Sequence, residues 1–119
     1  MDVPIQTPEV AVVADDPLVR SALLSLLSSQ HMLAETVAPD AIGLTSADVL
    51  GWDLGADAAD ARERIADVEE TELDVVALVP TASIAAPAIA AGARGLLSRE
   101  TSGAALASAV RAVRAGPVV

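Results

Sequence analysis

Cysteine is absent from the 119-residue chain, so disulfide bonds, zinc–thiolate sites and cysteine nucleophiles are excluded. Long apolar runs are absent too: they extend over about 4–8 residues, which is too short to span a bilayer. The amino terminus, Met1 to Pro4, has neither a basic region nor an apolar block of signal-peptide length. These absences together favour a cytoplasmic location.

Lysine is the second missing residue type, and all seven basic residues are arginine against 17 acidic residues, which gives a net charge of −10. Because cations that contact phosphates supply most nucleic-acid affinity, the chain alone is a poor candidate for binding DNA or RNA. The acidic surplus indicates either solubility or a local acidic site.

Aromatic residues are nearly absent, since there is no Phe or Tyr and Trp52 is the single tryptophan. Trp52 lies in the stretch Asp48–Gly55, which has the pattern of a short apolar strand that ends on Asp53. A carboxylate at the end of a buried strand is costly unless the site requires it. We predict that Trp52 is a core residue or covers the following helix; the alternative is a role in docking a partner.

Apolar runs alternate with helical patterns along the chain, which predicts a β-α unit repeated five times. Strands are expected at 9–14, 32–37, 48–53, 74–79 and 96–98, helices at 18–29, 57–70 and 83–91, at most two helical turns at 39–46, and a last helix capped by Thr101 or Ser102 and ended by Gly116 and Pro117. The predicted fold is α/β, a flavodoxin-like doubly wound five-stranded parallel sheet of order 2-1-3-4-5 with helices on both faces. Residues 1–8 are predicted to be a leader and 9–119 a single domain.

Three acids are expected to converge at one edge of this sheet. Asp15 and Asp16 follow the first strand, Asp53 ends the third, and these two strands are neighbours in the predicted order. Clustered carboxylates repel one another, and a bound Mg²⁺ would relieve that repulsion. One carboxylate could also act as a nucleophile toward a phosphoryl group. The alternatives are that Asp16 only caps the helix begun by Pro17, and that the acids share this edge by chance.

The chain resembles the receiver domain of two-component response regulators, most closely the LuxR/NarL-type transcriptional regulators. The motifs that carry the resemblance are Val10–Arg20, Asp48–Gly55, Ala91–Ser102 and the tail Ala109–Gly116. Their order and spacing together are more specific than any one motif, and the resemblance covers residues 9–119.

The resemblance implies a site for phosphorylation. Asp53 matches the phosphoacceptor, Asp15 the acid that holds Mg²⁺ directly, and Gly55 the residue whose backbone carbonyl joins the metal. The family has a pair of adjacent acids here, and Ala14 stands at the position of the first. Asp16 falls one position after the pair and is expected in the acidic pocket.

Four positions depart from the family pattern: Ala14 replaces an acid, Val79 the hydroxyl residue, Leu96 the aromatic switch residue and Arg99 the lysine. Thr81 or Ser83 could supply the missing hydroxyl from the loop. Arg99 is either a solvated loop cation or the partner of an internal salt bridge to Asp53 or Asp15. Magnesium binding at such a degenerate site is therefore doubtful.

Our leading hypothesis is an atypical, non-enzymatic receiver that controls transcription through dimerisation and protein contacts, with weak or no phosphorylation of Asp53. The alternative is a conventional Mg²⁺-dependent receiver phosphorylated by a sensor histidine kinase. A small flavodoxin-like nucleotide-binding protein is a third reading, but it would need a glycine-rich loop where the chain has Asp15, Asp16 and Pro17.

The dimer surface is expected on the last helix, with Leu106, Val110 and Val113, together with the helix at 18–29 or at 83–91. DNA would be bound only through a C-terminal helix-turn-helix domain that this subclass carries. The sequence ends at Val119, before such a domain, so we expect an excised receiver rather than a free-standing one.

Overall fold

The computed structural model describes residues 8–116, so residues 1–7 of the predicted leader and residues 117–119 lie outside the described residues. The elements are β1 (Val10–Val13), α1 (Pro17–Ser29), β2 (Ala34–Thr36), the 3-10 helix η1 (Pro39–Leu44), β3 (Val49–Asp53), α2 (Ala58–Glu70), β4 (Asp74–Val79), the 3-10 helix η2 (Ala82–Ile84), α3 (Ala85–Ala90), β5 (Gly95–Ser98) and α4 (Gly103–Ala115).

The five strands form one parallel sheet in the order β2-β1-β3-β4-β5, so the predicted fold class and strand order are confirmed. The register places Val13 beside Trp52 and Asp53 beside Leu78. Because parallel strands end at the same edge, the loops after β1, β3, β4 and β5 gather there.

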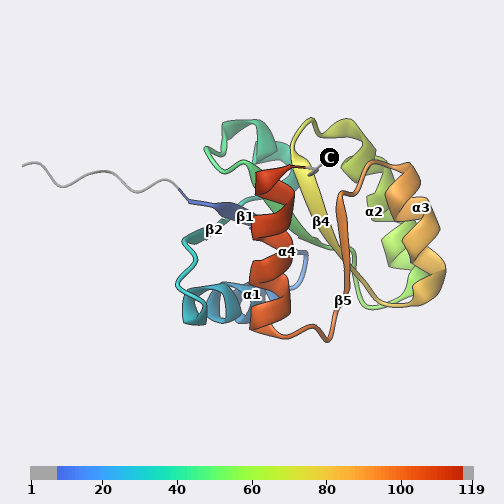
Figure 1. Cartoon of the computed structure of the whole chain (residues 1–119). Coiled ribbons are helices and arrows are strands. Elements are labelled where there is room, and N and C mark those ends of the chain that lie inside the picture. The colour runs from blue at the N-terminus through green and yellow to red at the C-terminus, as the bar shows by residue number, and fades with distance from the viewer. Residues whose placement is uncertain (1–7, 117–119) are drawn as a thin grey trace, which may run out of the picture.

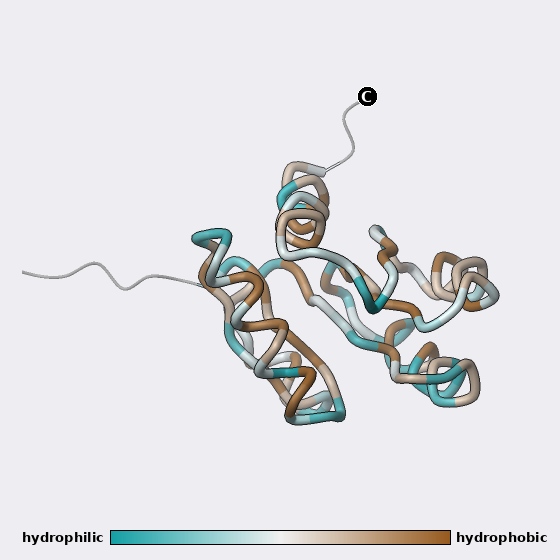
Figure 2. Tube along the Cα trace, turned by 90° about the horizontal axis from the view of Figure 1, so that it is seen from below, coloured by the Kyte–Doolittle hydropathy of each residue, from teal (hydrophilic) through white to brown (hydrophobic). Residues whose placement is uncertain are grey.

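Both faces of the sheet are covered, which is why β1, β3 and β4 are almost continuously apolar and buried. One hydrophobic core lies between the sheet and α1 with α4, and a second lies under η1, α2 and α3. Figure 1 shows α1 and α4 side by side on one face and α2 and α3 on the other. Figure 2 shows hydrophobic stretches of the trace at the centre, between these helices.

The helix ends follow the sequence signals. Asp16 is the N-cap of α1 and accepts a 2.8 Å hydrogen bond from the Leu18 N–H, with Pro17 as the first helical residue, as predicted. Ser102, rather than Thr101, caps α4 by accepting from the Ala105 N–H at 3.1 Å.

The elements around residues 32–37 and 82–91 differ from the prediction. β2 is only three residues long, whereas the short helix expected within 39–46 is present as the 3-10 helix η1. The helix expected at 83–91 is divided into η2 and α3, so Pro87 is the third residue of α3. A proline is tolerated there because the first-turn N–H groups of a helix have no intrahelical acceptor.

The prediction that Leu106, Val110 and Val113 of α4 form a dimer surface is wrong. These residues are buried in the core that α4 shares with α1 and the sheet. Their spacing of three and four residues marks the inner face of the helix, and burial there excludes contact with a second copy. Within residues 8–116, no helix is long and apolar enough to cross a membrane.

Candidate functional site

Asp53 and Arg99 form the central ion pair of the C-terminal edge of the sheet. The Arg99 Nε donates to Asp53 Oδ1 at 2.6 Å, and its Nη2 donates to Asp53 Oδ2 at 3.1 Å. The Asp53 side chain is 3% exposed and the Arg99 side chain 25% exposed. Of the roles predicted for Arg99, the salt bridge to Asp53 is therefore the one that forms.

Strand β5 positions the guanidinium. Arg99 directly follows β5, and its backbone N–H donates to the Val79 carbonyl at 3.1 Å, which fixes the start of the loop. Because β4 lies between β5 and β3, only a long side chain reaches Asp53 from this position. The hydrogen bond that Arg99 donates to Asp53 raises the pKa of Arg99 above its ordinary value; burial opposes the rise, and the charges of Asp53 and Asp16 add to it.

Asp15 has a different partner. Arg64 of α2 contacts Asp15 Oδ2 through Nε at 2.8 Å and through Nη2 at 2.7 Å. Asp15 remains 61% exposed, so this pair lies in solvent. The hydrogen bond to Asp15 is also the largest cause that raises the pKa of Arg64.

Sequence reasoning did not anticipate the role of Arg64. The available signal was that α2 begins just after Asp53, at the same sheet edge. Arg64 lies six residues after Ala58, or about 9 Å along the helix, and its side chain reaches back to Asp15.

Ala14 stands where the family pattern has its first acid. Ala14 is buried, and its carbonyl accepts a hydrogen bond from Arg20 Nη1 at 3.1 Å. Gly55 lies in the loop after β3 with φ of 115°, a conformation that favours glycine.

The carboxylates at this edge are not arranged to bind a divalent cation. Both carboxylate oxygens of Asp53 accept from Arg99, and Asp15 is paired with Arg64. In the part of the chain that the structure describes, no three His, Cys, Asp or Glu side chains come together as metal ligands. Guanidinium groups take the place that a metal would have in neutralising these two acids.

The predicted hydroxyl and switch positions carry apolar side chains, which cannot hydrogen-bond to the pair. Val79 is buried at the end of β4, and Leu96 is half-buried against the same core. The Thr81 and Ser83 hydroxyls bond one another at 2.8 Å. Neither hydroxyl is hydrogen-bonded to Asp53.

The ion pair lines an open cavity of about 470 Å³. The cavity is lined by Val19, Ala22, Leu23, Leu26, Asp53, Ala56, Leu78, Pro80, Ser98, Arg99 and Glu100. Its wall on the α1 side is apolar, and its polar groups come from the loops at the ends of β3 and β5.

No protein-family model and no curated protein matches the sequence. Among solved structures, a CheY-like protein, TadZ, from Pseudomonas aeruginosa PAO1 is 20% identical with a TM-score of 0.68, covering 96% of this chain and 98% of that one. The NtrC4 receiver domain, solved as a beryllofluoride-activated dimer, is 20% identical with a TM-score of 0.65, covering 86% of this chain and 92% of its own.

The response regulator ChrA of a heme-sensing two-component system is 28% identical with a TM-score of 0.65 over 94% of this chain. This chain spans 59% of the length of ChrA. The structural neighbours are thus CheY-like receiver domains of response regulators, and the present chain has their fold.

Proposed function

We propose that this chain is an atypical receiver domain of the LuxR/NarL type, in which Arg99 holds the phosphoacceptor position permanently neutralised. It acts as a regulatory module rather than an enzyme, through protein contacts and dimerisation, with weak or no phosphorylation of Asp53. The observation that carries the proposal is the two-point ion pair between Asp53 and Arg99.

The chemistry of the pair opposes phosphoryl transfer. A carboxylate attacks phosphorus through a free oxygen lone pair, and a guanidinium fork engages both oxygens of Asp53 at once. An ammonium in place of Arg99 would be a compact point charge that leaves more of the carboxylate free. The family's Mg²⁺ forms no part of the proposed mechanism, because the acids that would hold it are paired with arginines.

Incubation with a small phosphodonor and Mg²⁺, followed by intact-mass measurement, tests the proposal. We expect no stoichiometric adduct on the wild type. A matched sample of Asp53→Asn gives the background from other side chains. A stoichiometric adduct that disappears in Asp53→Asn would show that Asp53 is a working phosphoacceptor and would overturn the proposal.

A conventional phospho-receiver, served by a sensor histidine kinase, is the second candidate. It is favoured by the position of Asp53, which ends β3 at the carboxyl edge and lines a cavity open to solvent. It requires Arg99 to swing away when Mg²⁺ and phosphodonor arrive. The same mass measurement separates the two candidates.

Control of transcription through dimerisation is the proposed output. It is supported by the likeness to the response regulator ChrA and to the NtrC4 receiver, which was solved as a dimer. DNA contact would belong to a separate C-terminal domain of the intact regulator. Sedimentation equilibrium at high protein concentration tests the dimer, and a strict monomer would count against this part of the proposal.

A further inference from the structure

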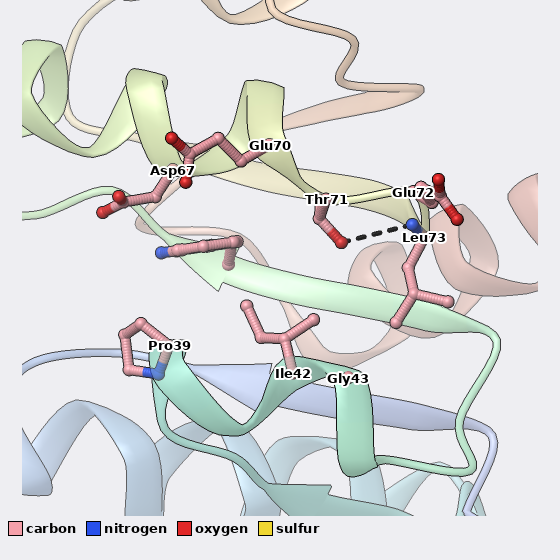
Figure 3. A pocket seen from close by; sticks show the side chains of 9 residues that line it. Pro39, Ile42, Gly43, Asp67, Glu70, Thr71, Glu72 and Leu73 are labelled. Carbon is pink, nitrogen blue, oxygen red and sulfur yellow. Dashed lines mark hydrogen bonds between the residues drawn. The ribbon is translucent and has the colours of Figure 1, made fainter.

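A second cavity, of about 400 Å³, lies on the face of the sheet opposite α1 and α4. It is lined by Pro39, Ile42, Gly43, Trp52, Asp67, Glu70, Thr71, Glu72 and Leu73. The short helix η1 forms one wall, and the end of α2 with the following loop forms the other (Figure 3). The Thr71 hydroxyl holds that loop by accepting from the Leu73 N–H at 3.2 Å.

Trp52 contributes a donor without a partner to this cavity. The residue is 1% exposed, and in the described part of the chain its indole N–H makes no hydrogen bond. Every fully enclosed side-chain nitrogen or oxygen among those residues does have a partner, so the indole N–H reaches the cavity space. Buried tryptophan N–H groups usually find an acceptor, and here the acceptor has to come from outside.

The wall formed by the end of α2 and the loop after it carries negative charge. Asp67, Glu70 and Glu72 line the cavity, and no ion pair among the described residues includes them. Asp67 and Glu70 lie in the last turn of α2, the negative end of the helix dipole, and Glu72 lies in the loop after it; the last turn of α2 has no basic residue. Carboxylates near the negative end of a helix dipole favour a bound cation. Figure 3 shows the Asp67 and Glu70 carboxylates on the same side, across from Pro39 and Ile42.

We propose that this cavity binds an organic cation of the arginine or lysine type. A guanidinium or ammonium group would pair with Asp67 and Glu70, and its aliphatic stem would lie against Ile42 and other apolar lining groups. A carbonyl at the other end of the ligand would accept from the Trp52 N–H. A bare metal ion does not fit, because no group of three acids in the described residues could hold one. The cation is either a free amino-acid derivative or a side chain of a partner protein.

The single tryptophan makes binding directly measurable, because its fluorescence reports on this cavity alone. The probe is Nα-acetyl-arginine amide, and the matched control is Nα-acetyl-citrulline amide, which replaces the guanidinium with a neutral group. At constant ionic strength, we expect a saturable change in emission with the arginine probe and none with citrulline. An equal response to both compounds, or no saturable response to arginine, would overturn the proposal.

Two charge-matched variants locate the site. Glu70→Gln should weaken binding about tenfold, the scale of one charge-assisted hydrogen bond. Glu69→Gln removes the same charge from an exposed neighbour that does not line the cavity, so it should leave affinity within about twofold. Equal weakening by both would mean diffuse attraction to an acidic surface, and the site would be refuted.

The donor role of Trp52 needs a readout besides fluorescence. In Trp52→Phe, the probe should raise the melting temperature less than in wild type, since ligand binding stabilises the folded state by mass action. An unchanged shift in a variant that melts cooperatively would remove the indole N–H from the proposal. A short arginine peptide that binds tighter than the free probe points to a partner protein, and weaker binding points to a free cation. The titration is independent of Asp53 chemistry and can be repeated in Asp53→Asn.

Discussion

Removing either partner of the central ion pair should have unequal effects on stability. Arg99→Met leaves the Asp53 carboxylate, 3% exposed, without its counter-charge. Asp53→Asn leaves the Arg99 guanidinium, which is 25% exposed and can be hydrated. The loss should therefore be larger when the arginine is removed than when the aspartate is changed.

The magnitudes follow from burial. Breaking a buried pair by deleting one member costs about 3–5 kcal/mol, because the remaining charge is uncompensated. The open cavity beside Asp53 admits water, so we expect the lower end, about 3 kcal/mol, for Arg99→Met. Asp53→Asn retains one acceptor oxygen and should cost about 1–2 kcal/mol. The double variant Asp53→Leu with Arg99→Met should fall within about 1 kcal/mol of wild type.

Urea unfolding followed by circular dichroism measures the free energy of unfolding for all four proteins. With a slope of about 1.5 kcal/mol per molar urea, Arg99→Met should lower the midpoint by about 2 M. Adding the single variant Asp53→Leu closes a double-mutant cycle with Arg99→Met and the double variant, and this cycle gives the coupling energy between the two side chains.

A loss below about 1 kcal/mol for Arg99→Met would refute the reasoning, because that is the range of an exposed surface pair. Equal losses for the two single variants would also contradict it, since the argument depends on the different exposure of the two side chains. Unchanged slopes across the set are the control that only stability has changed.

Four further outcomes are expected. Arg99→Lys should increase the mass-detected phosphodonor adduct on Asp53 by about tenfold, because it removes one of two charge-assisted hydrogen bonds. The raised pKa of Arg99 gives a sign for pH: its stabilising contribution is complete below the ordinary pKa of arginine and is lost only as the pH rises through the raised pKa. Raising the pH from about 7 to about 10 should therefore leave wild-type Asp53 unreactive in the same assay. Arg64→Ala breaks only the exposed pair with Asp15 and should lower the urea-derived free energy by less than about 1 kcal/mol. Gly55→Ala should cost about 1–3 kcal/mol in thermal unfolding, because the φ of 115° strains any side chain and a Cβ would meet a neighbouring side chain at 2.9 Å.

Local signals were sufficient where one short stretch fixes its own structure. Val75–Val79 is apolar, contains three valines and is bounded by Pro80, and the strand Asp74–Val79 has the predicted bounds. Asp16 followed by Pro17 specifies a helix start through one hydrogen bond and one fixed dihedral angle. The stretch at 39–46, in contrast, carries a proline and a glycine and no strong helical period, and it forms a 3-10 helix.

The partners of the long side chains could not be read from the sequence. Arg99 had two acids within conceivable reach, and only the observed order of β3, β4 and β5 assigns it to Asp53. Asp15 is paired with Arg64, 49 residues away, because α2 returns across the sheet from the same edge. A long, flexible side chain such as that of arginine can adopt many rotamers, so the sequence is compatible with several partners. The packing of the folded domain selects one of them.

The sequence by itself predicted the parallel α/β fold and the placement of Asp53 at the end of a strand, because apolar periodicity and turn residues act over short distances. Only the tertiary structure decided that two guanidiniums neutralise Asp53 and Asp15. It alone also showed that the inner face of α4 is core, and that the Trp52 N–H opens into an acidic cavity. These properties depend on which residues distant in the chain become neighbours, and therefore on the packing of the whole domain.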